Sequence, residues 1–245
     1  GLESVPAIAP IMVNPVVDPV ISIDDVTVNE AAGTMTFTVT LDQPTSATVS
    51  VNFATTPGSA VSPQDFTSVG GVLTFAPGVV TQVVTVNIKN DGIYEGSETF
   101  NVNLTSPVNA TIGDGLGIGT IKDDGTGVGG TDDDRPRVSS IDSPTVVEGG
   151  NLDFNVIMSN ISTTPTTVTL TPASGTATLG TDTSPLQVSF DGGASWTPLV
   201  GTTVSIPAGS GGFIVRVPTV NDTLGEANET MTLTASTPLG QMVGT

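Results

Sequence analysis

The chain has 245 residues, which suits two β-sandwich domains of ordinary size, and it carries 24 Asp and Glu against 5 Lys and Arg, a formal net charge of -19. A polyanion of this kind excludes nucleic acid as a partner, because nucleic-acid binding needs basic patches, and it argues against anionic membrane surfaces. The sequence has no Cys and no His, so thiol and imidazole nucleophiles, the usual zinc ligands and the commonest general base are missing. We therefore expect a protein that is not an enzyme.

The N-terminal half predicts one antiparallel sandwich over residues 20–125. Residues 1–19 are rich in Pro and apolar without a regular period, which favours an extended linker. After them, apolar residues alternate with Thr, Ser and Asn, the pattern of half-buried strands. The runs that show it are residues 35–41, 49–53, 73–75, 84–88, 100–104 and 118–121.

The middle of the chain separates two such domains. Residues 126–137 are rich in Gly and Asp and have no apolar alternation, which indicates a linker. Asp132, Asp133 and Asp134 within it either complete a site between the domains or keep the linker solvated. Alternation resumes over residues 138–245, so the sequence predicts an all-β chain of two tandem antiparallel Ig-like β-sandwiches.

An internal repeat relates the two halves. KNDGIYEGSETF, residues 89–100, and VNDTLGEANETM, residues 220–231, share five residues in one register, with Asn221 standing 131 residues after Asn90. GSAVSPQD, ending at Asp65, recurs as GTATLGTD, ending at Asp182, and VTVNE, ending at Glu30, recurs in TVVEG. Two copies of one module are therefore present.

The second copy differs from the first in two places. Its larger offset after Asp182 predicts an insertion at about residues 185–199, where SFDGGASW, residues 189–196, resembles an Asp-box hairpin that is usually structural. The copy also stops before a counterpart of GIGTIKDD, the last strand and acidic tail of the first module. We expect later residues of a parent protein to complete it, and an open sheet edge without them.

Acidic residues recur near the predicted strand ends of both modules. They are Glu30, Asp91, Glu95, Glu98, Asp123 and Asp124 in the first module and Glu148, Asp222, Glu226 and Glu229 in the second. Loops of a sandwich meet at its ends, so these carboxylates would gather, and two of them about 4 Å apart repel by roughly 4 kcal/mol at an effective dielectric of about 20. Oxygen ligands are what Ca²⁺ needs, so the set predicts calcium sites, with a solvated acidic rim as the alternative.

These motifs resemble the Calx-beta family, whose repeats have an early strand ending in Glu, an NDxxxEGxE turn and a terminal acidic run. The resemblance covers most of residues 20–125 and, more loosely, residues 138–245. It implies that the early Glu, the acidic turn and the terminal Asp residues bind Ca²⁺. A further ligand position of some members is Pro57 here and Ser174 in the second module, a departure that would weaken a site.

The tandem modules, the acidic linker and the missing Cys resemble the extender regions of calcium-dependent RTX-type bacterial adhesins. That resemblance implies a structural stalk on the bacterial cell surface, outside the cell, in which Ca²⁺ stiffens module ends and junctions. Its partners would be neighbouring repeat modules of the same chain, with a surface glycan or protein bound through other domains. Two alternatives stay open: a glycan- or protein-binding adhesion module that uses the insertion loop, and a metal-free spacer.

Overall fold

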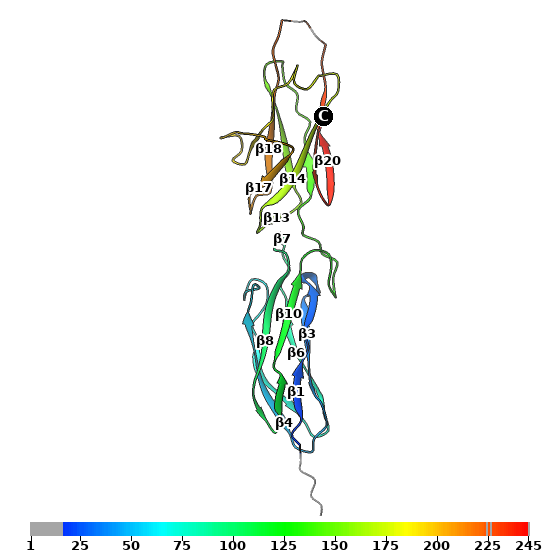
Figure 1. Cartoon of the computed structure of the whole chain (residues 1–245), viewed down its shortest axis with the longest axis vertical. Helices are drawn as coiled ribbons and strands as arrows, with labels where there is room; N and C mark the ends of the chain where they lie inside the picture. Colours follow the sequence, from blue (N-terminus) through cyan, green and yellow to red (C-terminus); the bar gives the residue numbers. More distant parts are fainter. Residues whose placement is uncertain (1–16, 224, 226, 245) are drawn as a thin grey trace, which may run out of the picture.

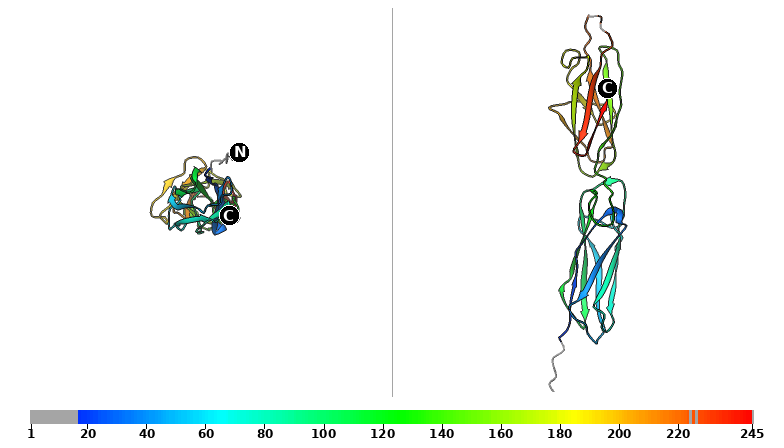
Figure 2. Two further views of the ribbon diagram at one scale, coloured as in Figure 1. Left: turned by 90° about the horizontal axis from the view of Figure 1, so that it is seen from below. Right: turned by 90° about the vertical axis from the view of Figure 1, so that its right-hand side faces the viewer.

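The computed structural model describes residues 17–223, 225 and 227–244, with the backbone alone for residues 241–243. Within these residues the regular structure is β-strand, apart from one 3-10 turn, η1 (Glu30–Ala32). The strands form two sandwiches stacked end to end along the long axis of the molecule (Figures 1 and 2). This confirms the predicted all-β tandem architecture. The first sixteen residues of the expected N-terminal linker lie outside the described residues.

Module 1 is a sandwich of two sheets with the strand orders β6-β3-β1-β9 and β2-β10-β8-β4-β5. Alternate side chains of β3 (Met35, Phe37 and Val39) are fully buried between the sheets, as their period of two requires. Phe100 packs edge-on against Phe37, with 5.9 Å between ring centroids. The strands are β1 (Val20–Ile23), β2 (Val26–Asn29), β3 (Thr34–Leu41), β4 (Val49–Pro57), β5 (Gly70–Phe75), β6 (Thr81–Asn87), β7 (Ile93–Tyr94), β8 (Glu98–Val108), β9 (Thr111–Asp114) and β10 (Leu116–Lys122).

Module 2 has the sheet orders β11-β12-β18-β15-β16 and β17-β14-β19-β20. Phe154, Leu170 and Leu233 are fully buried in a core separate from that of module 1. The strands are β11 (Val138–Ile141), β12 (Asn151–Met158), β13 (Ile161–Ser162), β14 (Thr166–Ser174), β15 (Gln187–Ser189), β16 (Thr197–Pro198), β17 (Thr203–Ile206), β18 (Gly212–Pro218), β19 (Met231–Thr237) and β20 (Gly240–Gly244). No helix among the described residues has the length and apolar character needed to cross a membrane.

The insertion of module 2 forms a hairpin in which β15 pairs with β16. The Asp191 carboxylate accepts hydrogen bonds from the Ser195 backbone N–H (2.9 Å) and the Ser189 hydroxyl (2.7 Å), which fixes the turn. The guanidinium of Arg216 lies 3.7 Å from the centre of the Trp196 ring, and Arg216 also forms an ion pair with Asp153. These contacts fasten the hairpin to strands β18 and β12 of the sheet whose edge it forms.

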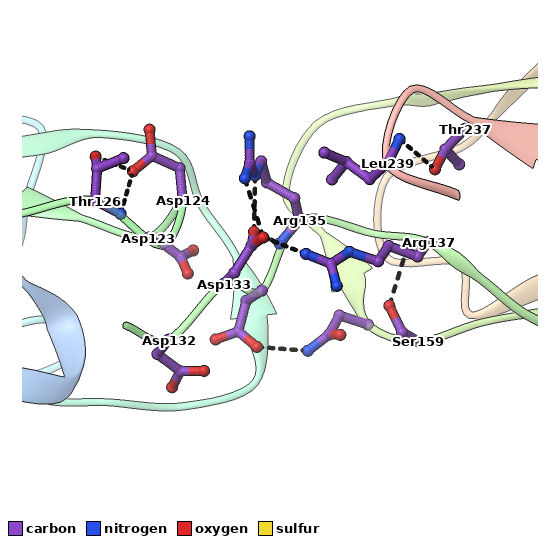
Figure 3. A network of polar contacts seen from close by, with 12 residues as sticks. Asp123, Asp124, Thr126, Asp132, Asp133, Arg135, Arg137, Ser159, Thr237 and Leu239 are labelled. Atoms are coloured by element: carbon purple, nitrogen blue, oxygen red, sulfur yellow. Dashed lines mark hydrogen bonds and ion pairs between the residues drawn. The ribbon is translucent and has the colours of Figure 1, made fainter. Parts of the chain in front are cut away.

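The two modules are joined by more than the chain that connects them. β7 of module 1 pairs in parallel with β13 of module 2, and the Thr163 N–H donates to the Tyr94 carbonyl at 2.9 Å (Figure 1). The segment that the sequence sets apart as a linker turns back onto module 1, where the Asn29 N–H donates to the Val128 carbonyl. Figure 3 shows Asp133 of this segment bound by the guanidinium groups of Arg135 and Arg137. Hydrogen bonds therefore tie the acidic end of module 1 to module 2.

Candidate metal centre

The candidate site lies at the end of module 1 that faces module 2. Glu30 follows β2 directly, in the turn η1, which the Asn29 side chain caps by accepting the Ala31 N–H at 3.0 Å. Gly33, with φ +70°, ends the turn in the left-handed conformation that favours glycine. The result is a buried Glu30 whose Oε1 accepts the Asp91 N–H at 2.6 Å.

The NDGIYEGSE segment supplies the next carboxylates from the turn between β6 and β8. Asp91 Oδ1 accepts the Ile93 N–H at 2.8 Å, and the Glu95 N–H donates to Asp123 Oδ2 at 2.8 Å. Glu98 opens β8 and pairs with Ile121 of β10, so the strand that carries Glu98 lies beside the strand that leads to Asp123. The sandwich thus gathers Glu30, Asp91, Glu95, Glu98 and Asp123 at one end.

Asp65 joins this group, although the sequence analysis did not single it out as a ligand. Its loop is held by a hydrogen bond from the Val61 N–H to Asp65 Oδ2 at 2.6 Å. Carboxylate oxygens of Asp65, Glu95 and Glu98 all lie within 4.8 Å of one another. The signal was present in the repeat, because GSAVSPQD and GTATLGTD both end in Asp. The space that these side chains enclose with Glu30, Asp91 and Asp123 is about 10 Å³, close to the room that one water molecule takes up.

Asp123 and Asp134 are the most unusual members of the set. Their residues are 2% and 6% exposed, yet Asp123 Oδ1 and Asp134 Oδ2 have no hydrogen-bond partner among the described residues. The other oxygen of Asp134 accepts the Asn160 side-chain N–H of module 2 at 2.6 Å. Buried carboxylate oxygens without partners are costly, because a charge taken out of water needs a compensating donor or cation. These two atoms point to a missing positive ligand.

Asp124 and Asp132 differ from Asp123 in what they contact. The Asp124 carboxylate accepts hydrogen bonds from the Thr126 backbone and hydroxyl, which lower its pKa, and Figure 3 shows it turned away from Asp123. Asp132 instead accepts the Asn90 side-chain N–H at 3.0 Å. Burial raises the pKa of Asp123 and the charges of Asp134, Glu95 and Asp132 add to the rise, so the two linker residues Asp134 and Asp132 belong to the electrostatic group. Asp124 is held by its own turn.

The electrostatics of the group favour protonated carboxyls when no cation is present. Burial, followed by the charges of Asp123 and Asp91, raises the pKa of Glu30 to about 7. Burial raises the pKa of Glu98 to about 8, with Asp65 as the next cause, and raises that of Asp123 to about 7. A bound divalent cation would reverse these shifts by favouring the ionised forms.

Module 2 repeats part of this arrangement. Glu148 Oε1 accepts the Asp222 N–H at 3.0 Å, the counterpart of the Glu30 and Asp91 contact in module 1. Asp182 Oδ2 accepts the Thr178 N–H at 2.6 Å, as Asp65 does with Val61. Glu229 is exposed, and partial desolvation, followed by the charge of Asp182, raises its pKa. Glu226 lies outside the described residues.

The donor set of module 1 fits a hard cation. Every candidate ligand side chain is a carboxylate, and two of the buried oxygens lack a partner. Ca²⁺ takes six to eight oxygen ligands in flexible geometry, whereas zinc prefers nitrogen and sulfur, which this chain cannot supply from His or Cys. The carboxylates that line the enclosed space could hold such an ion, and Asp134 lies close enough to raise the pKa of Asp123; the lining carboxylates are Glu30, Asp65, Asp91, Glu95, Glu98 and Asp123.

Comparison with known proteins agrees with the sequence resemblance over module 1. Residues 18–118 match the model of the Calx-beta domain family. Among solved structures, the apo form of the Calx CBD1 domain is 25% identical, with 42% of this chain and 96% of that chain covered and a TM-score of 0.41. CBD12 from CALX1.2 is 17% identical, with 88% of this chain and 79% of that chain covered and a TM-score of 0.42. No curated protein matches the sequence.

Proposed function

We propose that this chain is a pair of calcium-binding structural modules from the stalk of a bacterial cell-surface adhesin, without catalytic activity. Ca²⁺ would be held by the acidic end of module 1 and would stiffen the junction with module 2. The observation that carries the proposal is the pair of buried, unpartnered oxygens, Asp123 Oδ1 and Asp134 Oδ2, inside a group of carboxylates. The match of residues 18–118 to the Calx-beta family supports the same reading, and a matched solved structure is described as a calcium binding domain.

The position of the site supports a mechanical role. Asn160 of module 2 donates to Asp134 Oδ1 at 2.6 Å and to the Gly92 carbonyl at 3.2 Å. β7, which pairs with β13 across the junction, lies in the same turn as Asp91 and Glu95. A cation that neutralises this turn and Asp134 would therefore stabilise the segments that contact the neighbouring module.

The metal part of the proposal is tested by calcium titration of the chain after treatment with EDTA. We expect heat of binding and a rise in melting temperature. The free energy of unfolding should increase by about 2.7 kcal/mol when free calcium is 100 times the dissociation constant. Asp123→Asn should weaken binding strongly. Asp18→Asn is the matched control, because it removes the same charge from an exposed position before β1, at the far end of module 1. Equal affinity of the two variants would count against the site.

The stalk role needs a separate test in the source cells. Antibodies raised against this chain should label intact cells, and calcium chelation should not release the label, since the metal stabilises the module and does not anchor it. Labelling that appears only after the cells are broken open would contradict the surface assignment.

The alternative binding role of the insertion has less support. One face of Trp196 is covered by the Arg216 guanidinium, and Asp191 is engaged with Ser189 and Ser195 within the turn. These contacts favour a structural hairpin.

A further inference from the structure

The insertion of module 2 covers a strand edge that module 1 leaves open. In module 2, β18 pairs with β12 on one side and with β15 of the insertion on the other. In module 1, β6 pairs antiparallel with β3 as β18 does with β12, and among the described residues no strand pairs with the other side of β6. The sheet of module 1 therefore ends at β6, whereas the sheet of module 2 continues past β18.

The repeat shows that β6 and β18 are the same strand of the module. Val217 of β18 stands 131 residues after Val86 of β6, the spacing that also separates Asn221 from Asn90. Both valines are fully buried, and each faces the strand that opens the alternating pattern of its module. The edge that β15 occupies in module 2 is therefore the edge that is open in module 1.

The two modules diverge just before this edge. In module 1, the Thr67 N–H donates to the Asn87 carbonyl at 2.9 Å, and the chain then crosses to β5 in the other sheet. In module 2, the Ser184 N–H donates to the Pro218 carbonyl at 2.8 Å, and the chain continues along β18, where Gln187–Ser189 pairs with it antiparallel. The insertion is thus the segment that covers this edge in module 2.

Module 1, which lies within the described residues, protects its other three edge strands. The linker segment covers β2, where Val28 forms a bridge with Val128. β9 has four residues and an irregular register with β1, and the Thr74 carbonyl of β5 accepts the Gln82 side-chain N–H at 2.7 Å. β6 has seven residues with no charge, no Pro and no register shift against β3. Charges, Pro, bulges and covering segments are the features that keep edge strands from pairing with another chain, and β6 lacks them.

The exposed side chains of β6 are uncharged and complementary to themselves. They are Thr81, Val83, Thr85 and Asn87. In an antiparallel pair with its two-fold axis at Val83, this residue lies opposite its own copy and Thr81 lies opposite Thr85. Pairs of β-branched residues across strands stabilise a sheet, and Val83 is 52% exposed without such a partner. Because the net charge of -19 makes two copies of this chain repel each other, an uncharged strand is a favourable place for them to meet.

We propose that β6 pairs antiparallel with β6 of a second copy of this chain, which joins their four-stranded sheets into one continuous sheet. The β18 edge takes the uncharged strand Gln187–Ser189, and β6 itself is an uncharged strand that can fill the equivalent edge. Backbone hydrogen bonds hold the pair, as in other cases of β-strand addition, and the symmetric contact closes a dimer. The dimer does not depend on the metal site, since none of the residues that line that site belongs to β6.

The first test measures the mass of the full chain by analytical ultracentrifugation at rising concentration, in calcium. We expect a reversible increase from 24.6 kDa toward twice that mass. Val83→Lys should weaken the association by about tenfold or more, because two Lys would face each other at the axis. Val108→Lys is the matched control, since Val108 is 53% exposed and belongs to β8 in the other sheet, and this variant should associate as the parent does.

Thermal melts of both Lys variants establish that each keeps the fold. A parent chain that stays monomeric up to its limit of solubility would overturn the proposal. So would folded Val83→Lys that associates as strongly as Val108→Lys.

A second test examines the register of the pair. The sequence has no Cys, so Val83→Cys introduces a single thiol. Cβ atoms of directly opposite residues on antiparallel strands lie about 4.5–5.5 Å apart, close to the span of a disulfide. Mild oxidation should therefore link Val83→Cys into a covalent dimer and leave Val108→Cys largely monomeric. Equal cross-linking of the two variants would contradict pairing through β6.

Discussion

Glu30→Gln should change the stability of module 1 in opposite directions with and without calcium. Burial and the neighbouring Asp123 and Asp91 raise the pKa of Glu30 from 4.5 to about 7. A change of one in pKa corresponds to about 1.4 kcal/mol, so ionising this buried carboxyl in the calcium-free fold costs about 3 kcal/mol more than ionising it in the unfolded chain. The amide oxygen of Gln can still accept the Asp91 N–H without carrying the charge. Near pH 8 and without calcium, the variant should therefore be more stable than the parent chain by about 1–3 kcal/mol.

With saturating calcium the order should reverse, because the parent gains a negatively charged ligand that the variant lacks. Melting curves in EDTA and in calcium measure the stability difference between variant and parent under the two conditions. A difference of about 1 kcal/mol in the free energy of unfolding corresponds to a shift of roughly 4–8 °C in melting temperature for a module of this size. Asp18→Asn is again the control and should move neither curve. A Glu30→Gln variant that is destabilised equally in both conditions would show that Glu30 serves only as a hydrogen-bond acceptor, and this reasoning would be refuted.

Four further outcomes follow. The calcium-free chain should lose stability as pH rises from about 4.5 to about 8, since carboxyls whose folded pKa is raised stabilise the fold while protonated, and urea titrations should show this loss disappear in calcium. Asp124→Asn should lower calcium affinity far less than Asp123→Asn in calorimetry, because Thr126 already holds Asp124. Asn160→Ala should increase bending between the modules in small-angle scattering, since its side chain bonds both Gly92 and Asp134. Trp196→Ala should destabilise module 2 by about 1 kcal/mol or more through loss of the Arg216 contact, as seen in thermal melts, without altering calcium binding by module 1.

The strands could be predicted from the sequence because their signal is local. Met35, Phe37 and Val39 alternate with Thr, and all three are fully buried, as a period of two on one face of a sheet requires. β7 and β13 have two residues each and no period, so their pairing across the junction left no such signal. That contact depends on how two separate modules meet, which alternation within either of them does not encode.

The candidate site could be predicted in part for the same reason. The repeat marks Glu30, Glu98 and Asp65 with their counterparts, but the proximity of Asp65 to Glu98 depends on a loop that only the fold brings there. Asp123 and Asp124 are neighbours in the sequence and differ in their contacts, because the Thr126 hydroxyl donates to Asp124 in a local turn while Asp123 is buried at the acidic end of module 1. Composition alone treats the two residues as equivalent.

The most direct measurement is a crystal structure of the chain grown with calcium, with anomalous scattering used to locate the ion. The account predicts density for Ca²⁺ at the end of module 1, with Asp123 Oδ1 and Asp134 Oδ2 at about 2.3–2.6 Å from an ion. Well-ordered carboxylates at this end with no ion among them would contradict it.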